Sequence, residues 1–143
     1  MRKRIFRGKS KLYNKWLYGS LLQNETYKSD TYIAEYCLSN LSYNQSPVLP
    51  NSVGEFTGWY DINKKPIFEG DIVRIKGNPD NNDWREVDYN ALIIFENGGF
   101  CAIDGTITDY GFRRYDLIRG GDFTVEVIGN NVDNNMEDFE IGR

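Results

Sequence analysis

Carboxylates beside the predicted hairpins are the residues of this sequence that could perform acid–base chemistry. Asp104, Asp109 and Asp116 fall near predicted turns, and a pair of carboxylates can act as general acid and general base. Aspartate next to glycine is also ordinary turn composition, because its side chain accepts hydrogen bonds from the backbone. We favour the structural role, keep an acid–base enzyme as an alternative, and predict no catalytic residue.

The polar segment 77–83 is a candidate for a cation-binding loop. Asn78, Asp80 and Asn82 alternate along it as ligands do in a calcium-binding EF-hand. Asp83 stands where that loop needs a glycine for its sharp turn, and Tyr89 stands where it needs a bidentate glutamate. We therefore predict a solvated turn and no metal site.

Several catalytic classes are excluded by residue types that are missing from the sequence. The chain has no histidine, which excludes Ser-His-Asp and Cys-His catalysis and histidine-ligated zinc. Gly98-Gly99 is followed neither by a Lys-Ser/Thr pair nor by a predicted helix, so no phosphate-binding loop is expected. We predict a non-enzymatic protein without a cofactor.

The cysteines and the first residues of the chain indicate in which cellular compartment the protein is found. Cys37 and Cys101 both lie in apolar surroundings, so we expect two buried thiols, with a single disulfide as the alternative. The basic segment 2–4 is followed by only two apolar residues before basic residues return, which does not predict a signal peptide. No apolar run approaches the roughly 20 residues that span a bilayer. We predict a cytoplasmic protein with no membrane contact.

Charge is distributed unevenly along the chain. The first 24 residues carry seven bases and no acid, whereas the rest carries ten bases and 21 acids. The basic segment can meet nucleic-acid phosphates or pair with the acidic remainder of its own chain or of a neighbouring subunit, and we favour such self-pairing. Under the nucleic-acid alternative, the contact residues would be Arg2, Lys3, Arg4 and Arg7.

Aromatic residues make up 15% of the chain, with ten Tyr, eight Phe and three Trp. Exposed aromatics beside bases, such as Trp16, Tyr18, Tyr27 and the segment 112–115, would suit single-stranded nucleic acid. Aromatics in strands more commonly anchor a core or a subunit interface, and we favour that role for Trp16 and Tyr18. Their exposure decides between the two interpretations.

The elements that position these residues are predicted to be strands. Short runs rich in Ile, Val, Tyr and Phe are separated by Gly and Asn, with hardly any helical periodicity between them. The expected strands are Lys3–Phe6, Lys15–Leu22, Thr31–Cys37, Asp71–Lys76, Ala91–Phe95, Phe100–Ile103 and Asp122–Ile128.

Two turns are predicted from local composition. Asn97-Gly98-Gly99 lies between two apolar runs and predicts a tight hairpin, because Asn and Gly tolerate positive φ. Ser52 and Glu55 have the spacing of a capping box, which predicts a short helical turn that ends at Gly58.

A third predicted turn leads into a strand at Glu69-Gly70-Asp71. The glycine permits a tight entry, and the aspartate can cap the turn before the strand begins. Glu69 could serve as an acid at a site, but we favour a structural hydrogen bond to the turn amides.

Five segments in order resemble the YopX family, small proteins encoded mostly by phages and prophages of bacteria. They span nearly the whole chain: Phe6-Arg7-Gly8, Lys15-Trp16-Leu17-Tyr18-Gly19, Val53-Gly54-Glu55-Phe56-Thr57-Gly58, Pro66-Ile67-Phe68-Glu69-Gly70-Asp71-Ile72-Val73 and Glu126-Val127-Ile128-Gly129-Asn130. The sequence departs from the family pattern at Glu55, where Gln is usual, and around Asp88-Tyr89-Asn90, where a Gly commonly precedes the strand.

This resemblance implies a mainly β fold with an SH3-like barrel-type core, an additional N-terminal β segment and short helical turns. It also suggests self-association, and it implies no assigned activity. The family-motif positions, which we expect to be structural, are Trp16, Gly19, Gly54, Phe56, Gly58, Glu69, Gly70, Asp71, Gly129 and Asn130.

We expect three parts along the chain and a role in binding. The expected parts are an N-terminal β segment with an irregular connection (1–50), the barrel core (51–130) and an acidic C-terminal tail (131–143). The predicted function is that of a phage-derived, non-enzymatic protein of the bacterial cytoplasm, which acts through homo-oligomerisation and a macromolecular partner. That partner would be an unidentified protein or, in the alternative, nucleic acid bound by the basic N-terminal arm.

Overall fold

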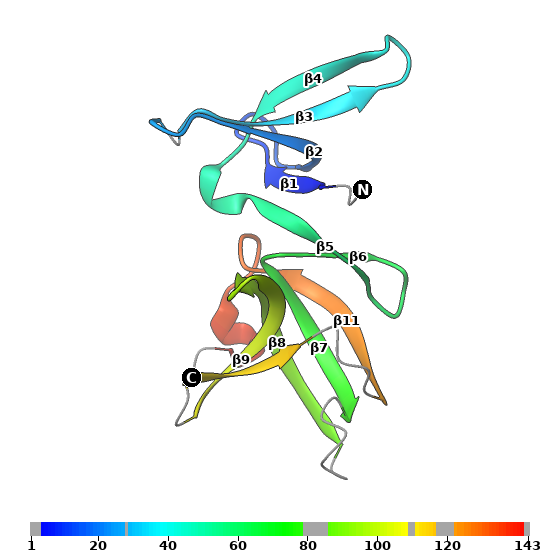
Figure 1. Ribbon diagram of the computed structural model, residues 1–143, viewed down its shortest axis with the longest axis vertical. Coiled ribbons are helices and arrows are strands. Elements are labelled where there is room, and N and C mark those ends of the chain that lie inside the picture. The colour runs from blue at the N-terminus through cyan, green and yellow to red at the C-terminus, as the bar shows by residue number, and fades with distance from the viewer. Residues whose placement is uncertain (1–3, 28, 79–85, 109–110, 117–121, 142–143) are drawn as a thin grey trace. The chain divides into compact units, whose positions relative to one another are not determined.

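The computed structural model describes residues 4–27, 29–78, 86–108, 111–116 and 122–141, without the side chains of 105–108, 111–116 and 122 (Figure 1). The chain divides into two compact units, Met1–Phe56 and Thr57–Arg143, and the division lies within one strand, β5. The described elements are strands and two single 3-10 turns. The prediction of a mainly β protein is therefore confirmed.

The first unit is built from antiparallel strands in the order β4-β3-β2-β1-β5, after which β6 follows in the same strand order. Their bounds are β1 Phe6–Lys9, β2 Trp16–Gln23, β3 Thr31–Cys37, β4 Ser42–Pro47 and β5 Gly54–Tyr60. β3 and β4 form a long hairpin, with β4 on its outer side (Figure 1). The predicted strand Thr31–Cys37 is confirmed at both ends, and β1 begins three residues later than expected.

The predicted helical turn at Ser52 is wrong. A single 3-10 turn, Pro50–Ser52, ends at Ser52 instead of beginning there, and the residues after Val53 belong to strand β5. The hydroxyl of Ser52 accepts a hydrogen bond from the Lys9 amide at 2.7 Å and donates to the Leu49 carbonyl, so it does not cap a helix. Gly58 lies inside β5 instead of ending a helix.

The core of the first unit is small and lies on one face of its sheet. Leu17, Ile33 and Val48 are buried there, with Phe6, Leu21 and Val53 packed against them. Strand alternation explains this arrangement, because Leu17 and Leu21 share one face of β2.

The second unit is built on a five-stranded antiparallel sheet in the order β10-β9-β8-β7-β11. Its strands are β6 Pro66–Phe68, β7 Asp71–Asn78, β8 Val87–Glu96, β9 Gly99–Thr108, β10 Gly111–Asp116 and β11 Asp122–Asn130, and a 3-10 turn follows at Met136–Phe139. The described strands of the chain form open sheets without a closed barrel. The mainly β class is shown, and the SH3-like description stays a prediction.

Two predicted turns of the second unit are confirmed. Glu96 pairs with Gly99 across a two-residue turn in which Asn97 and Gly98 have φ values of 53° and 79°, as a tight hairpin requires. Gly70 has a φ of 90°, and the Asp71 carboxylate accepts a hydrogen bond from the Phe68 amide at 2.8 Å.

The core of the second unit consists of residues from β6, β7, β8 and β9. The buried members are Ile67, Val73, Ile75, Ala91, Ile93 and Ala102. The turn between β5 and β6 is joined to β11 through Asp61, whose carboxylate accepts hydrogen bonds from the amides of Asn63, Lys65 and Val127. One buried carboxylate thus fixes both a turn and a strand.

The segment after β11 is ordered by local contacts in its described part. Asn130 accepts hydrogen bonds from the amides of Val132 and Asp133, and Ile141 is buried. No helix in the described ranges is both long and apolar enough to cross a membrane.

Candidate functional site

One face of the first unit's sheet gathers aromatic and basic side chains, and we call it the aromatic face. Strand registers place its members together, because Arg7 pairs with Tyr18, Lys9 with Trp16, Leu22 with Tyr32 and Tyr36 with Tyr43. Alternation puts the small core on the opposite face. The aromatic face consists of Arg7, Lys9, Trp16, Tyr18, Leu22, Tyr32, Tyr36 and Tyr43.

At one end of the aromatic face, two cations contact the same indole ring. The guanidinium of Arg7 lies 4.6 Å from the ring centroid of Trp16, and the ammonium of Lys9 lies 5.4 Å from it. Both distances are in the range of cation–π contacts. Arg7 is only 6% exposed, so it supports Trp16 and presents little of its own surface to a ligand.

At the other end of the aromatic face, tyrosine rings are open to solvent. Tyr36 is 49% exposed and Tyr43 is 62% exposed, and their ring centroids are 5.1 Å apart. Tyr18 is also exposed. Rings presented in this way can stack on bases or on flat side chains.

The predicted nucleic-acid contacts do not form a free basic arm in the described residues. Arg4 makes a bidentate contact with Glu55, with Nε 3.0 Å from Oε1, and this partner raises the pKa of Arg4. Arg7 is buried against Trp16. Arg2 and Lys3 lie outside the described residues.

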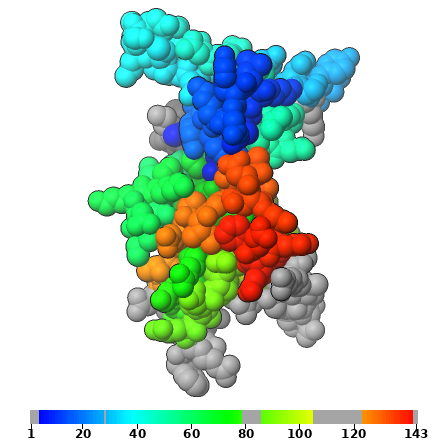
Figure 2. Space-filling view, turned by 180° about the vertical axis from the view of Figure 1, so that it is seen from behind, coloured from blue at the N-terminus to red at the C-terminus, as the bar shows by residue number. Residues whose placement is uncertain are grey.

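A second feature of this unit is its uncharged edge. β4 is the outermost strand of the sheet, and the sequence from Tyr36 to Gly54 contains no Asp, Glu, Lys or Arg. The turn that leads into β4 exposes two leucines, Leu38 at 78% and Leu41 at 75%. This hairpin is the cyan projection in Figure 2.

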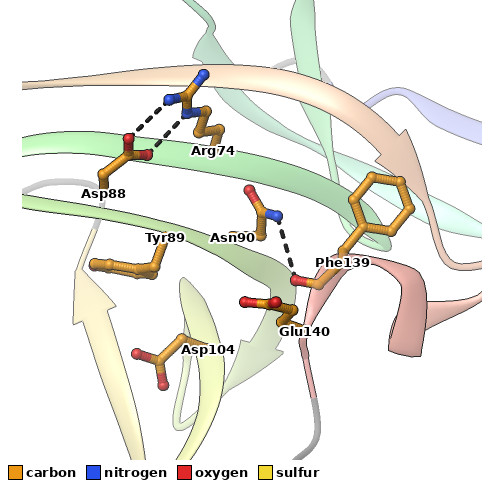
Figure 3. A pocket seen from close by; sticks show the side chains of 7 residues that line it. All are labelled: Arg74, Asp88, Tyr89, Asn90, Asp104, Phe139 and Glu140. Carbon is orange, nitrogen blue, oxygen red and sulfur yellow. Dashed lines mark hydrogen bonds and ion pairs between the residues drawn. The ribbon is translucent and has the colours of Figure 1, made fainter.

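The second unit contains a polar hollow of about 390 Å³ (Figure 3). Its lining residues are Arg74, Asp88, Tyr89, Asn90, Asp104, Phe139 and Glu140. Polar groups of the hollow bind one another. Arg74 donates two hydrogen bonds to the Asp88 carboxylate at 2.8 and 2.7 Å, and the Asn90 amide donates one to the Phe139 carbonyl at 3.2 Å. The hydrogen bond from Arg74 lowers the pKa of Asp88.

The hollow contains one of the three carboxylates that the sequence offered for acid–base chemistry. Asp104 is buried beside it, whereas Asp109 and the side chain of Asp116 lie outside the described residues. Asp80 and Asn82 of the polar loop also lie outside them. Within the described ranges, no three Asp, Glu, Cys or His side chains are grouped to hold a metal ion.

Both cysteines are free thiols, as expected, but their exposure is intermediate, so the prediction that they are buried is wrong. Cys37 ends β3 at the hairpin turn, where its sulfur lies 3.0 Å from the Ser39 hydroxyl. This hydrogen bond lowers the pKa of the Cys37 thiol.

Two family-motif glycines lie where a side chain has no room. A Cβ at Gly19 would lie 2.9 Å from the carbonyl carbon of Ala34 and closer still to its oxygen, and one at Gly129 would lie 2.7 Å from Oδ1 of Asn134. These glycines allow β2 to approach β3, and β11 to approach the chain that follows it.

The other family-motif positions lie at strand pairs and turns. Trp16 belongs to the aromatic face. The rest are placed in β5, in the turn before β7 and at the ends of β7 and β11: Gly54 (opposite Arg7), Phe56, Gly58, Glu69, Gly70, Asp71 and Asn130.

Sequence reasoning missed Tyr36 and Tyr43 as surface residues. The alternation Tyr32, Ala34, Tyr36 in the predicted strand was a usable indication, because these three residues share one face. The opposite face of the sheet meets the core, where Val48, which lies beyond β4, packs with Leu17 and Ile33. That long-range contact is not readable from strand pattern alone.

Comparison with known proteins identifies a family. No curated protein and no solved structure matches the chain. The model of the YopX protein family matches residues 5–136, which include the aromatic face and the polar hollow's strands. The chain therefore belongs to the YopX family.

Proposed function

We propose that this YopX-family protein is a phage-derived, non-enzymatic protein of the bacterial cytoplasm that self-associates and binds a macromolecular partner. The observation that carries the self-association is the exposed outer strand β4 with the turn that leads into it, a segment that contains no charged residue. The aromatic face of the same unit supplies the surface for a partner. For the second unit we propose an SH3-like core, which its five-stranded antiparallel sheet supports.

The outer edge of β4 is suited to pair with a second copy of itself. Natural proteins usually protect such an edge with lysines, a bulge or proline. Between Ser42 and Pro47, β4 has a proline only at its last position and no charged residue. Two copies related by a two-fold axis bring identical residues together. A segment without charge meets no like-charge repulsion in that arrangement.

The exposed leucines enlarge the contact that two β4 strands can make. A specific interface commonly buries about 800 Å² on each partner, which is more than a single short strand provides. Leu38 and Leu41 lie on the turn adjoining β4 and are exposed. Their burial against a second copy adds apolar area, which drives association.

Charged residues on the β4 edge test this proposal. Asn44→Lys combined with Gln45→Lys places two lysines at exposed positions of β4, and Asn44 faces Glu35 on β3, so the fold can accommodate the change. The matched control is Asn63→Lys with Asn131→Lys, two exposed positions of the second unit with the same change in net charge. We expect the β4 variant to lower the sedimenting mass and the control to leave it unchanged.

A mass of one chain for the unmodified protein across the micromolar range would contradict self-association. Unchanged assembly of the β4 variant would place the interface elsewhere, for example at the predicted anchors Trp16 and Tyr18. The absence of enzymatic activity is tested with hydrolase and transferase substrates. Turnover that is abolished by Asp104→Asn would overturn that part of the proposal.

A further inference from the structure

We propose that the aromatic face binds single-stranded nucleic acid, with unpaired bases stacked on its tyrosines and phosphates neutralised by Lys9 and the turn between β1 and β2. The inference rests on the proposed function, because it names the macromolecular partner of that unit. The sequence suggested the basic N-terminal arm as the nucleic-acid contact. The present inference assigns that contact to a surface built from four strands, β1 to β4.

Three exposed tyrosines, Tyr18, Tyr36 and Tyr43, share the aromatic face. Tyr18 and Tyr36 each lie two residues beyond the last β2–β3 pair, Ser20 with Ala34, on the same face of the sheet. Tyr43 is the direct partner of Tyr36 on β4. The ring centroids of this pair are 5.1 Å apart and the ring planes are inclined by 60°. Every base has a π face, and exposed rings of this kind therefore bind bases without strict sequence preference.

Charge favours a polyanion on this face. The aromatic face carries Arg7 and Lys9 and no acid, and the nearest acids in the strands point away from it: Glu35 and Glu55 alternate onto the opposite face, where Glu55 pairs with Arg4. The acids that make the chain negative overall are concentrated after residue 24.

The turn between β1 and β2 extends the basic and aromatic pattern. Lys11, Tyr13 and Lys15 alternate along it, and the Lys15 ammonium lies 5.7 Å from the Tyr13 ring centroid. This turn directly adjoins Lys9 and Trp16, the end of the aromatic face with the cation–π contacts. Phosphates of a strand that stacks on the tyrosines meet ammonium groups at this end.

Stacking distinguishes a single strand from a duplex. The bases of a duplex are stacked on each other and present only their edges, so flat rings on a sheet cannot insert between them.

Edge-to-edge pairing of β4 in two copies of the chain also suits an extended ligand. An antiparallel strand pair has its two-fold axis perpendicular to the sheet, and the aromatic faces of two copies then lie on the same side.

Fluorescence anisotropy with the full chain tests the inference, with fluorescein-labelled dT20 and rU20 as probes and an unlabelled mixed-sequence duplex as competitor. Tyr36→Ser and Tyr43→Ser should each weaken binding about 5- to 100-fold, and Tyr43→Phe should preserve it, because stacking needs the ring and not the hydroxyl. The matched control is Tyr60→Ser in the second unit, where Tyr60 is 61% exposed.

The salt dependence provides a second readout. Each neutralised phosphate adds about −0.7 to the slope of log K against log salt for a single strand. Lys9→Ser should reduce the slope by about that amount, and Lys65→Ser in the second unit should not change it. Thermal melts of each variant show whether the fold is intact.

Four results would overturn the inference. They are no binding of either probe at about 50 mM salt, equal binding of the duplex, the same loss for Tyr60→Ser as for Tyr43→Ser, or binding that only the lysine change affects. Sedimentation separates this inference from the proposed function. An assembled protein that binds no probe refutes the nucleic-acid partner alone, and a single chain that binds dT20 refutes self-association alone.

Discussion

Asp61 is predicted to contribute strongly to the stability of the second unit. One of its oxygens accepts hydrogen bonds from the amides of Asn63 and Lys65 at 2.8 Å each. The other oxygen accepts a hydrogen bond from the Val127 amide at 3.0 Å. Asp61→Asn replaces one acceptor oxygen with an NH2 group. If that group faces Val127, two donors oppose each other and the amide of Val127 loses its partner.

The magnitude follows from these three hydrogen bonds. Hydrogen bonds to a charged group contribute about 1.5 to 3 kcal/mol each, and an unsatisfied buried donor costs about 1 to 3 kcal/mol. The carboxamide introduced by Asp61→Asn would keep two bonds in weakened, uncharged form and lose the third. We expect a loss of about 2 to 4 kcal/mol, which lowers the melting temperature of a unit of this size by roughly 10 to 30 °C.

The pH dependence gives an independent check on the charge of Asp61. Burial raises the pKa of this carboxyl, but the amide hydrogen bonds of Val127, Lys65 and Asn63 outweigh burial and hold the pKa below its ordinary value. A carboxylate with a lowered folded-state pKa stabilises the fold fully above its unfolded-state pKa of about 4 and loses that contribution as the pH falls through the folded-state value. The difference between the protein and Asp61→Asn should be constant from about pH 8 to 5 and shrink at lower pH.

Thermal or urea unfolding at pH 7, 5 and 3 measures both effects. The control is Asp88→Asn, which removes an exposed ion pair with Arg74 and should change stability little, because solvent and salt screen such pairs. An Asp61→Asn variant that unfolds like the parent at pH 7, or a difference that is as large at pH 3 as at pH 7, would refute the reasoning.

Two further predictions concern glycines. Gly19→Ala should destabilise the first unit by about 1 to 3 kcal/mol in thermal melts, because its Cβ overlaps the Ala34 carbonyl group, whereas Gly99→Ala meets nothing within 4 Å and should melt like the parent. Gly58→Val and Gly70→Val should each cost about 1 to 3 kcal/mol, because their φ values of 87° and 90° strain a β-branched residue. Parent-like melts of both valine variants would contradict the strain argument.

The parts of the fold that the sequence predicted are those that local chemistry determines. The Asn97-Gly98 turn and the Gly70-Asp71 entry depend on residues that are adjacent in the chain, and both were confirmed. β4 was not predicted, because Ser-Tyr-Asn-Gln-Ser-Pro has little apolar alternation and becomes a strand by pairing with β3.

The helical turn predicted from the capping-box spacing at Ser52 is wrong for a related reason. The spacing of Ser52 and Glu55 is compatible with a helix, but Ser52 finds other partners in the Lys9 amide and the Leu49 carbonyl. Glu55 of β5 accepts a hydrogen bond from Arg4, which precedes β1. The contacts of Ser52 with Lys9 and of Glu55 with Arg4 belong to the tertiary structure, which overrides a local pattern.

For the candidate site, too, the sequence predicted the local composition but not the tertiary contacts. The basic and aromatic composition of the first unit was evident from the sequence, but the arm it suggested is absent from the described residues, because Arg7 supports Trp16 and Arg4 pairs with Glu55. The surface is formed by exposed tyrosines instead. The core with Val48, Leu17 and Ile33 lies on the opposite face of the sheet.

The residue types on the two faces of this sheet support the proposal that the exposed face makes a contact. The core face uses Leu17, Ile33 and Val48, which have no polar side-chain atoms, whereas the aromatic face uses tyrosines such as Tyr36 and Tyr43. A face that only had to be soluble would carry charged or small polar side chains. Tyrosine combines a large apolar ring with a hydroxyl that stays hydrated, and it is therefore enriched at surfaces that are wet when free and buried when bound. The proposed partner is therefore expected to cover the exposed pair Tyr36 and Tyr43.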